Sequence, residues 1–269
     1  MKTVLLAGGT SETGAIAAGL AAAGWDVVVS TATDLPLDVS HGATAIRRRC
    51  GRLDAAGFAA LIRAEKAAAV VSAGHPYAAE LRTAVRRAAA EAGVPLVEFL
   101  RPPAGAPPEG VTVRRAADHA EAARLAVQAG RSLLLTIGVT HLVPYVAAAR
   151  AARATICARV LPGVPSRAAA RAAGLGETEI VAGRGAVSAA ENEALIRRLG
   201  ADVLVTKDSG EAGGLRAKYE AARRTGCTVI LVERPADAVP VDAARSVAEV
   251  VANVQRLTFN AQRSTRTGA

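Results

Sequence analysis

The chain has 269 residues, which is long enough for two domains of ordinary size. Hydrophobic residues make up 51% of it, but no apolar run reaches the about 20 residues that span a bilayer, so no membrane segment is expected. The formal net charge of +9 comes from 33 basic residues, of which only four are lysine.

Two interpretations of the arginine excess stay open. An Ala- and Arg-rich chain can present a solvated basic surface without a ligand, or its guanidinium groups can bind carboxylates and phosphates through paired hydrogen bonds. Specific binding of nucleic acid is not expected, because aromatic residues are only 3% of the chain and no helix-turn-helix or zinc motif is present. The three cysteines lie far apart and predict no metal site.

The first hundred residues alternate short β-rich runs with Ala-rich stretches, which is typical of a parallel sheet with crossover helices. A glycine turn cuts the first apolar run too early for a secretory leader, so a cytoplasmic location is expected. The expected elements are strands at 4–7, 25–31, 44–48, 68–72 and 94–99, with helices at 11–23, 54–66 and 76–92.

A glycine-rich turn follows the first strand and comprises Gly8, Gly9, Thr10, Ser11 and Glu12. Glycines allow a tight turn and a close approach of the backbone to a pyrophosphate, which the amide groups at the start of the next helix would attract. We therefore predict that these five residues bind a dinucleotide. The turn is not a strict G-x-G-x-x-G motif, so a strand-to-helix turn without a ligand is the alternative.

The second strand ends in hydroxyl-bearing residues, Ser30, Thr31 and Thr33, where enzymes that prefer NAD place an acidic residue. Arginines follow at 47–49 and at position 52, within possible reach of these hydroxyls. This pattern favours a 2′-phosphate, so we predict that the three hydroxyls bind NADPH. Asp34 follows closely and argues for the opposite preference.

The loop after the strand at 68–72 contains His75 and Tyr77 on either side of Pro76. Open α/β sheets bind ligands at the carboxyl ends of their strands, and both side chains can donate a proton. We predict that His75 and Tyr77 are catalytic, although solvent could supply the proton instead.

Four prolines within residues 101–110 interrupt the helical and strand patterns and predict a domain boundary. The expected domains are a dinucleotide-binding domain at 1–104 and a second α/β domain at 105–269, which closes with a helix at 242–257 and a fraying polar tail from 260. The other expected elements of the second domain are strands at 132–136, 154–161, 202–206 and 228–232, with helices at 118–129, 189–199 and 211–225.

The strand at 202–206 runs into a second polar, glycine-rich loop with Lys207, Asp208, Ser209 and Gly210. Lys207 supplies a point charge, Ser209 and the loop amides supply donors, and Asp208 could orient Lys207 or cap the next helix. We predict that Lys207 and Asp208 are catalytic and that Lys207, Ser209 and Gly210 bind the substrate. A capping turn with an exposed ion pair is the alternative.

Four short motifs follow one another along the chain, at residues 8–12, 51–54, 75–78 and 206–210. In their order and over about residues 2–235, the chain resembles the precorrin-6A reductases of cobalamin biosynthesis. The resemblance implies two Rossmann-like domains facing each other across a cleft. It further implies hydride transfer from NADPH to a polycarboxylate tetrapyrrole, precorrin-6A, giving precorrin-6B, with Arg52 among the groups that bind the substrate.

The sequence departs from the family pattern at Gly74, where a threonine is common, at 185–187, where Gly-Pro-Phe is common, and in the loop at 136–139, which lacks the usual serine. These differences concern substrate contacts rather than the class of reaction. A monomer or small homo-oligomer is expected.

Several alternatives remain open: a cobalt-precorrin-6A reductase using NADH, a methyltransferase of the same pathway, and a non-catalytic α/β protein that binds a nucleotide or nucleic acid. Another NADP-dependent reductase or epimerase would need a Tyr-x-x-x-Lys pair, which Tyr145 and Tyr219 do not provide.

Overall fold

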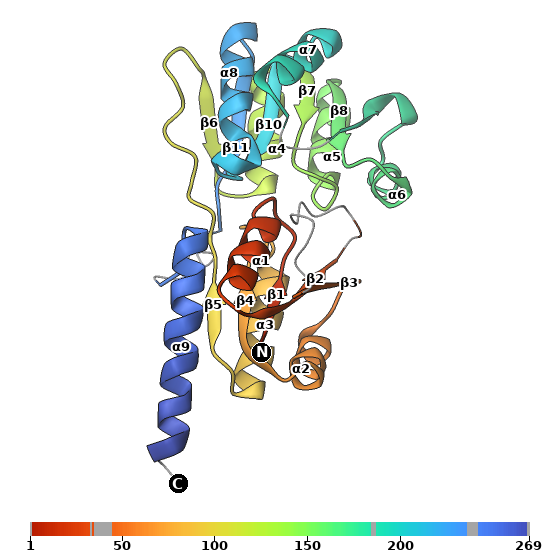
Figure 1. Ribbon diagram of the computed structural model, residues 1–269. Helices are drawn as coiled ribbons and strands as arrows, with labels where there is room; N and C mark the ends of the chain where they lie inside the picture. Colours follow the sequence, from red (N-terminus) through yellow and green to blue (C-terminus); the bar gives the residue numbers. More distant parts are fainter. Residues whose placement is uncertain (1, 33, 35–44, 184–186, 236–241, 268–269) are drawn as a thin grey trace. The chain divides into compact units, whose positions relative to one another are not determined.

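The computed structural model describes residues 2–32, 34, 45–183, 187–235 and 242–267 (Figure 1). The chain forms two compact units, the first containing Met1–Arg101 and Ala236–Ala269 and the second containing Pro102–Pro235. Each unit has one sheet in which all the paired strands run parallel, with helices in the connections. The predicted pair of parallel α/β domains is confirmed.

The sheet of the first unit has the strand order β3-β2-β1-β4-β5. Its central strands are runs of Val, Leu and Ala buried on both faces, as parallel strands covered by helices require. The order reverses between β1 and β4, so the carboxyl ends of these two strands are where such a sheet binds ligands. The elements are β1 (Thr3–Ala7), α1 (Thr13–Ala22), β2 (Asp26–Thr31), β3 (Ile46–Cys50), α2 (Ala55–Ala64), β4 (Ala67–Ser72), α3 (Ala79–Ala92) and β5 (Leu96–Glu98).

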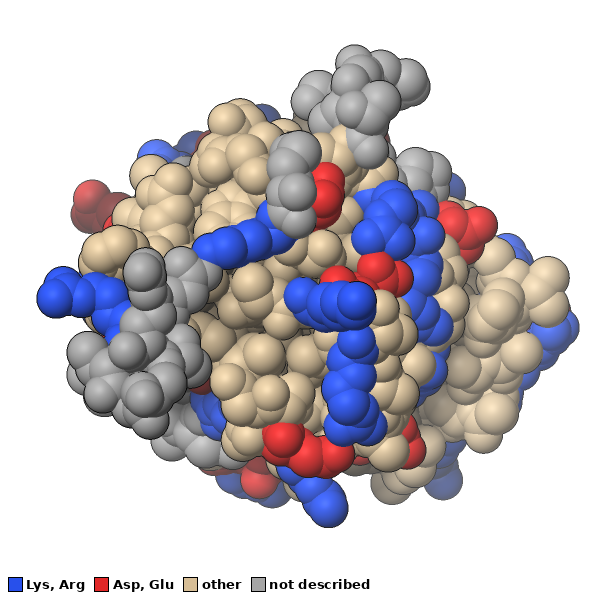
Figure 2. Space-filling view, turned by 60° about the horizontal axis from the view of Figure 1, so that its bottom comes forward, with Lys and Arg blue, Asp and Glu red and all other residues tan. Residues whose placement is uncertain are grey.

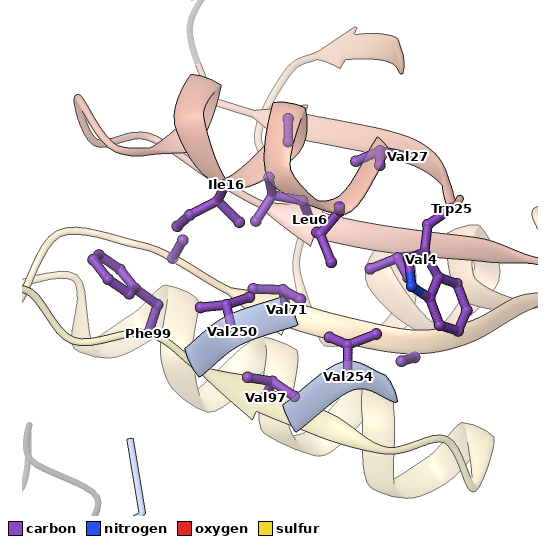
Figure 3. Packing of buried hydrophobic residues seen from close by; sticks show 14 of the residues in the cluster. Val4, Leu6, Ile16, Trp25, Val27, Val71, Val97, Phe99, Val250 and Val254 are labelled. Carbon is purple, nitrogen blue, oxygen red and sulfur yellow. The ribbon is translucent and has the colours of Figure 1, made fainter. Parts of the chain in front are cut away.

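Helix α9 (Val247–Thr267) returns to the first unit and packs against α1, β4 and β5. Figure 3 shows Val250 and Val254 of this helix beside Val71 and Val97, in a cluster that also contains Trp25. The C-terminal limit predicted for the second domain is therefore wrong. Hydrophobic periodicity indicates that the helix buries one face, but it does not indicate which sheet receives that face.

The sheet of the second unit has the strand order β6-β11-β10-β7-β8-β9, and its order reverses between β10 and β7. The strands are β6 (Val113–Ala116), β7 (Ser132–Leu135), β8 (Thr155–Val160), β9 (Ile180–Ala182), β10 (Val203–Lys207) and β11 (Thr228–Val232). The helices are α4 (His119–Ala129), α5 (Val143–Ala152), α6 (Val164–Ala172), α7 (Ala189–Leu199) and α8 (Leu215–Thr225), with short 3₁₀ helices at Glu177–Glu179 and Glu211–Gly213.

The surface arginines are frequently paired with acidic residues. Among the described residues Arg63 pairs with Glu91 and Arg86 with Glu98. On the face shown in Figure 2, basic side chains are interspersed with acidic ones and do not form one continuous basic field.

Within the described part of the chain no helix combines the length and apolarity needed to cross a membrane.

Candidate functional site

The glycine-rich turn lies at the point where the strand order of the first sheet reverses. The amide of Gly8 donates to the carbonyl of Ser30 at 2.9 Å, which ties the turn to β2. The hydroxyl of Thr10 donates to the carbonyl of Ala73 at 3.2 Å, which ties it to the loop after β4. The turn therefore connects the carboxyl ends of β1, β2 and β4.

Thr13 fixes the shape of this turn from inside helix α1. Its Oγ1 accepts hydrogen bonds from the amides of Gly9 at 3.0 Å and Thr10 at 3.1 Å, and the residue is fully buried. A Cβ on Gly8 would lie 2.3 Å from Cγ2 of Thr13, so only glycine fits there. Gly9 has a φ of +143° and open space where its side chain would be, so this position requires glycine while leaving room above the turn.

The side chains of Ser11 and Glu12 bind a buried arginine. Arg101 forms a two-pronged ion pair with the Glu12 carboxylate, and its Nη2 also donates to Oγ of Ser11 at 2.9 Å. Burial raises the pKa of Glu12, but the hydrogen bond and the charge of Arg101 outweigh burial and bring this pKa below its ordinary value. The Glu12 carboxylate thus forms an ion pair with a protein side chain, whereas the sequence predicts that Glu12 binds a dinucleotide directly.

The hydroxyls that end β2 are close to two arginines of β3. Because β2 and β3 are parallel, Ser30 pairs with Arg49, whose Nη1 donates to Oγ of Ser30 at 2.9 Å. Nη2 of Arg48 donates to Oγ1 of Thr31 at 3.2 Å. Asp34 is an exposed carboxylate that pairs with Arg48 at 3.3 Å.

Two further arginines of the predicted set, Arg47 and Arg52, are placed differently. Arg47 turns away to pair with Glu65. Arg52 is exposed after the end of β3. Thr33 lies outside the described residues.

The loop after β4 is built around Arg82 of α3. This arginine is buried and donates to the carbonyls of His75 at 3.2 Å and Pro76 at 2.6 Å. The Nδ1 atom of His75 accepts a hydrogen bond from the amide of Tyr77 at 3.3 Å, and the two rings lie 5.6 Å apart. The predicted His75 and Tyr77 are therefore neighbours, and the bond between Thr10 and Ala73 holds their loop against the glycine turn.

The predicted loop of the second unit follows β10, beside the point where the strand order reverses. Burial lowers the pKa of Lys207 to about 8. The carboxylate of Asp208 pairs with Arg234 at 3.3 Å and accepts from the amide of Gly210 at 3.3 Å. Ser209 donates through Oγ to the carbonyl of Gly213 at 3.1 Å, so this hydroxyl and Asp208 shape the loop around Lys207.

A second lysine lies behind this loop and is not singled out by the sequence pattern. Lys218 of α8 is 3% exposed, and its Nζ donates to Oγ1 of Thr206 at 3.0 Å. Burial, together with the charges of Arg159 and Lys207, lowers its pKa to about 7. Only the structure shows that Lys207, Lys218 and Arg159 are close, because they come from β10, α8 and β8.

Sequence reasoning also missed a group of rings in the second unit. His119 begins α4, His141 lies in the loop after β7, and Tyr145 is in α5. Nδ1 of His119 and the hydroxyl of Tyr145 share a hydrogen bond at 2.8 Å, and the rings of His119 and His141 stack at 4.2 Å. The signal in the sequence is two histidines at the carboxyl ends of strands, but β6 is too short to have been predicted.

No group of three or more His, Cys, Asp or Glu in the described residues could hold a metal ion.

A shallow hollow of about 290 Å³ lies at the opposite end of the first sheet, near Lys2, Trp25 and Phe259. It adjoins the amino ends of β1 and β2, whereas parallel sheets bind ligands at the carboxyl ends of their strands. The glycine turn and the Lys207 loop are therefore the stronger candidates.

Known proteins of one type resemble this chain over nearly its full length. A family model described as precorrin-6x reductase CbiJ/CobK matches residues 3–255. A precorrin-6A reductase of Rhodococcus erythropolis is 35% identical over 265 residues, which cover 96% of this chain and 99% of the relative. A cobalt-precorrin-6A reductase of Methanothermobacter thermautotrophicus is 34% identical over 235 residues, which cover 87% and 76%. The solved structure of a CobK precorrin-6A reductase has a TM-score of 0.75 at 29% identity and covers 95% of this chain and 97% of its own.

Proposed function

The chain belongs to the precorrin-6x reductase family, and we propose that it transfers a hydride from NADPH to a double bond of precorrin-6A, giving precorrin-6B in cobalamin biosynthesis. The choice of NADPH rests on one observation. At the end of β2, the hydroxyls of Ser30 and Thr31 accept hydrogen bonds from Arg49 and Arg48. Two guanidinium groups beside two hydroxyls suit a ribose that carries a phosphate.

The glycine turn fits the pyrophosphate of such a dinucleotide. Among the described residues, no atom lies within 4 Å of the place where a Cβ of Gly9 would stand, which leaves the backbone there open to a ligand. The first amides of α1 have no acceptor within the helix, and the positive end of the helix dipole lies at the same point. When bound, a reduced nicotinamide would supply the hydride.

The protein's own groups hold the macrocycle and manage charge. Lys207 gives a positive charge to which a carboxylate of the substrate binds, while the loop formed by Asp208, Ser209 and Gly210 keeps that lysine in place. His75 and Tyr77 stand beside the glycine turn, where either could give a proton to the carbon next to the one that accepts the hydride. Catalysis here is mainly the positioning of two large ligands.

The proposal is tested by supplying the purified protein with precorrin-6A and either NADPH or NADH, and by following loss of the reduced nicotinamide absorbance. We expect precorrin-6A-dependent oxidation of NADPH, with a lower kcat/KM for NADH. Absence of oxidation with either dinucleotide, in protein that is folded and binds NADPH, would contradict the proposed reaction.

Asp34 supports a second candidate function, reduction of cobalt-precorrin-6A with NADH. Its exposed carboxylate lies 3.3 Å from Arg48, near the end of β2, and an acidic residue in that region suits a ribose diol. Repeating the assay with cobalt-precorrin-6A separates the two candidates, because the second requires a higher kcat/KM for NADH and for the cobalt-bound macrocycle.

A further inference from the structure

Three rings of the second unit form a row that runs from the core to the surface. Tyr145 is fully buried, His119 is half-buried, and His141 is exposed. The rings of Tyr145 and His119 meet edge to face at 5.8 Å and 80°, and those of His119 and His141 stack at 4.2 Å with only 17° between their planes. The exposed ring of His141 therefore rests on a support fixed in the core.

The support is held by a hydrogen bond and by helix geometry. The hydroxyl of Tyr145 and Nδ1 of His119 are 2.8 Å apart, and His119 is the first residue of α4, whose N-cap Asp118 accepts from the amide of Glu121 at 2.8 Å. Nε2 of His119 is shielded from solvent and makes no hydrogen bond with any of the residues that the structure describes. Leaving a buried polar atom unsatisfied is costly, which indicates that the ring is retained for something other than stability.

Both imidazole rings are electrically neutral near pH 7. Burial, together with the charges of His141 and Lys207, lowers the pKa of His119 to about 4 against an opposing effect of Asp118. Burial also lowers the pKa of His141, and the charge of Lys207 adds to this effect. Two neutral rings stack without repulsion, and Lys207 is close enough for its charge to affect both.

The row stands at the ligand-binding edge of the second sheet. His141 follows β7 and Lys207 ends β10, and these two strands are neighbours where the strand order reverses. One face of the His141 ring is covered by His119, while the residue as a whole is exposed, which leaves the opposite face as the one for a ligand to stack on. An open flat ring beside a cation matches a ligand that is both conjugated and acidic.

We propose that His141, supported by His119 and Tyr145, is a stacking platform for the conjugated ring system of the tetrapyrrole, and that Lys207 beside it binds one of the acidic arms of the same ligand. This assignment rests on the proposed function and deepens it, because it places a macrocycle contact on the second unit alone. His119 and Tyr145 are positioning residues that hold the platform.

The test is an NMR titration of histidine-labelled protein with uroporphyrin, a flat tetrapyrrole with acetate and propionate arms. The chain has only four histidines, so their ring signals can be assigned by substitution. The ring current of a porphyrin moves the signals of a ring stacked on it strongly upfield. We expect the largest upfield shift at His141, with a smaller one at His119 beneath it and a smaller one at His75 than at His141.

Substitutions of His141 then test whether binding depends on the flat shape of the ring or on the nitrogen atoms of the imidazole. His141→Ala should weaken uroporphyrin binding by about three- to ten-fold, while His141→Phe, which keeps a flat ring, should restore most of it. Val143→Ala, at a residue that is 62% exposed on the neighbouring helix, is the matched control and should bind uroporphyrin like the wild type. NADPH affinity and Tm should stay unchanged in all three variants.

The outcomes distinguish this assignment from the proposed function. If precorrin-6A is reduced but uroporphyrin does not bind, or binds with its largest shift at His75, the platform is wrong and the reductase activity stands. If His141→Ala binds uroporphyrin as tightly as the wild type, the platform is also wrong. If precorrin-6A is not reduced while His141 still shows the shift, the platform stands and the proposed reaction falls.

Discussion

Arg47 and Arg49 lie on the same face of strand β3, because side chains two residues apart along a strand share a face, yet they have different partners. Arg49, near the carboxyl end of the strand, donates through Nη1 to Oγ of Ser30 at 2.9 Å, whereas Arg47, nearer the amino end, pairs with Glu65. The basic run at 47–49 is therefore not one uniform patch. Its members differ in the chemistry that each can serve.

Arg49→Gln should weaken the binding of NADPH by about ten-fold or more while leaving NADH unaffected, because only the 2′-phosphate loses a charge-assisted hydrogen bond. The dissociation constants of the two reduced dinucleotides measure this directly. Arg47→Gln is the matched control, since it removes the same charge from the same strand on the side of Glu65. An equal loss for NADPH and NADH in Arg49→Gln would mean that the arginine shapes the loop and does not bind the phosphate.

Lys207 should make binding of an acidic ligand depend on pH. Its pKa is lowered to about 8 by burial, so the side chain is charged below that pH and loses its charge as the pH rises through it. The affinity for uroporphyrin should therefore fall as the pH is raised through about 8. Lys207→Met should bind more weakly at pH 7 and lack this step, and a step that persists in Lys207→Met would assign it to another group.

At the scale of single residues, the sequence predicts where a functional loop lies better than it predicts which side chains contact one another. The glycine turn and the loops of His75 and Lys207 follow strands and are visible as local strings. The support of His141 is not visible as a local string. His119 lies far away in the sequence, at the start of α4, and Tyr145 lies on the next helix, α5. The three rings meet only because β6 and β7 belong to one sheet. The burial of Lys218 is likewise a result of packing.

Among the elements, helix α1 depends on a side chain that also builds the glycine turn. Oγ1 of Thr13 accepts hydrogen bonds from two amides of the turn, so the first residue of the helix and the glycine turn form one structure. Thr13→Val should destabilise the protein by about 1–3 kcal/mol, since the amides of Gly9 and Thr10 lose their acceptor, and should weaken NADPH binding. Urea unfolding and dinucleotide titration test both effects.

Thr13→Ser keeps the hydroxyl and is the control for this substitution. It should bind NADPH like the wild type and lose little stability. Wild-type affinity in Thr13→Val would show that the turn does not need the hydroxyl to keep its binding shape.

The predicted central elements agree closely with the structure, while the short edge strands and two helices were not predicted. β6 contains two arginines in four residues, and β9 has only three residues, so neither shows a strand-like apolar run. Helices α5 and α6 each begin with a proline in the first turn, a residue that starts helices but reads as a loop in a sequence. Helix α9 begins later than predicted and continues to Thr267 through the expected polar tail, since no glycine or proline interrupts it.

At the scale of the whole molecule, the buried Lys218 should make the free energy of unfolding depend on pH. Its pKa is lowered from 10.5 to about 7 in the folded protein, so between these pH values the unfolded chain binds the proton and the folded chain does not. The free energy of unfolding then rises with pH across that window, and the benefit is absent below about pH 7. Lys218→Met should remove this part of the rise, as urea unfolding at several pH values would show, and an unchanged slope would mean that Lys218 is charged when folded.

Because α9 packs into the core of the first unit, we expect this helix to be needed for the stability of that unit. Val254 is fully buried and shares its cluster with Trp25, while Ala252 on the same helix is exposed. Val254→Asp places a carboxylate in an apolar core, which costs on the order of several kcal/mol. Because Trp25 is the only tryptophan in the chain, its fluorescence reports on the first unit, and we expect its unfolding midpoint in urea to fall sharply together with NADPH affinity. Ala252→Asp should leave both unchanged. If Val254→Asp unfolds at the wild-type midpoint, α9 does not form part of that core, and the first unit would be complete without the C-terminal helix.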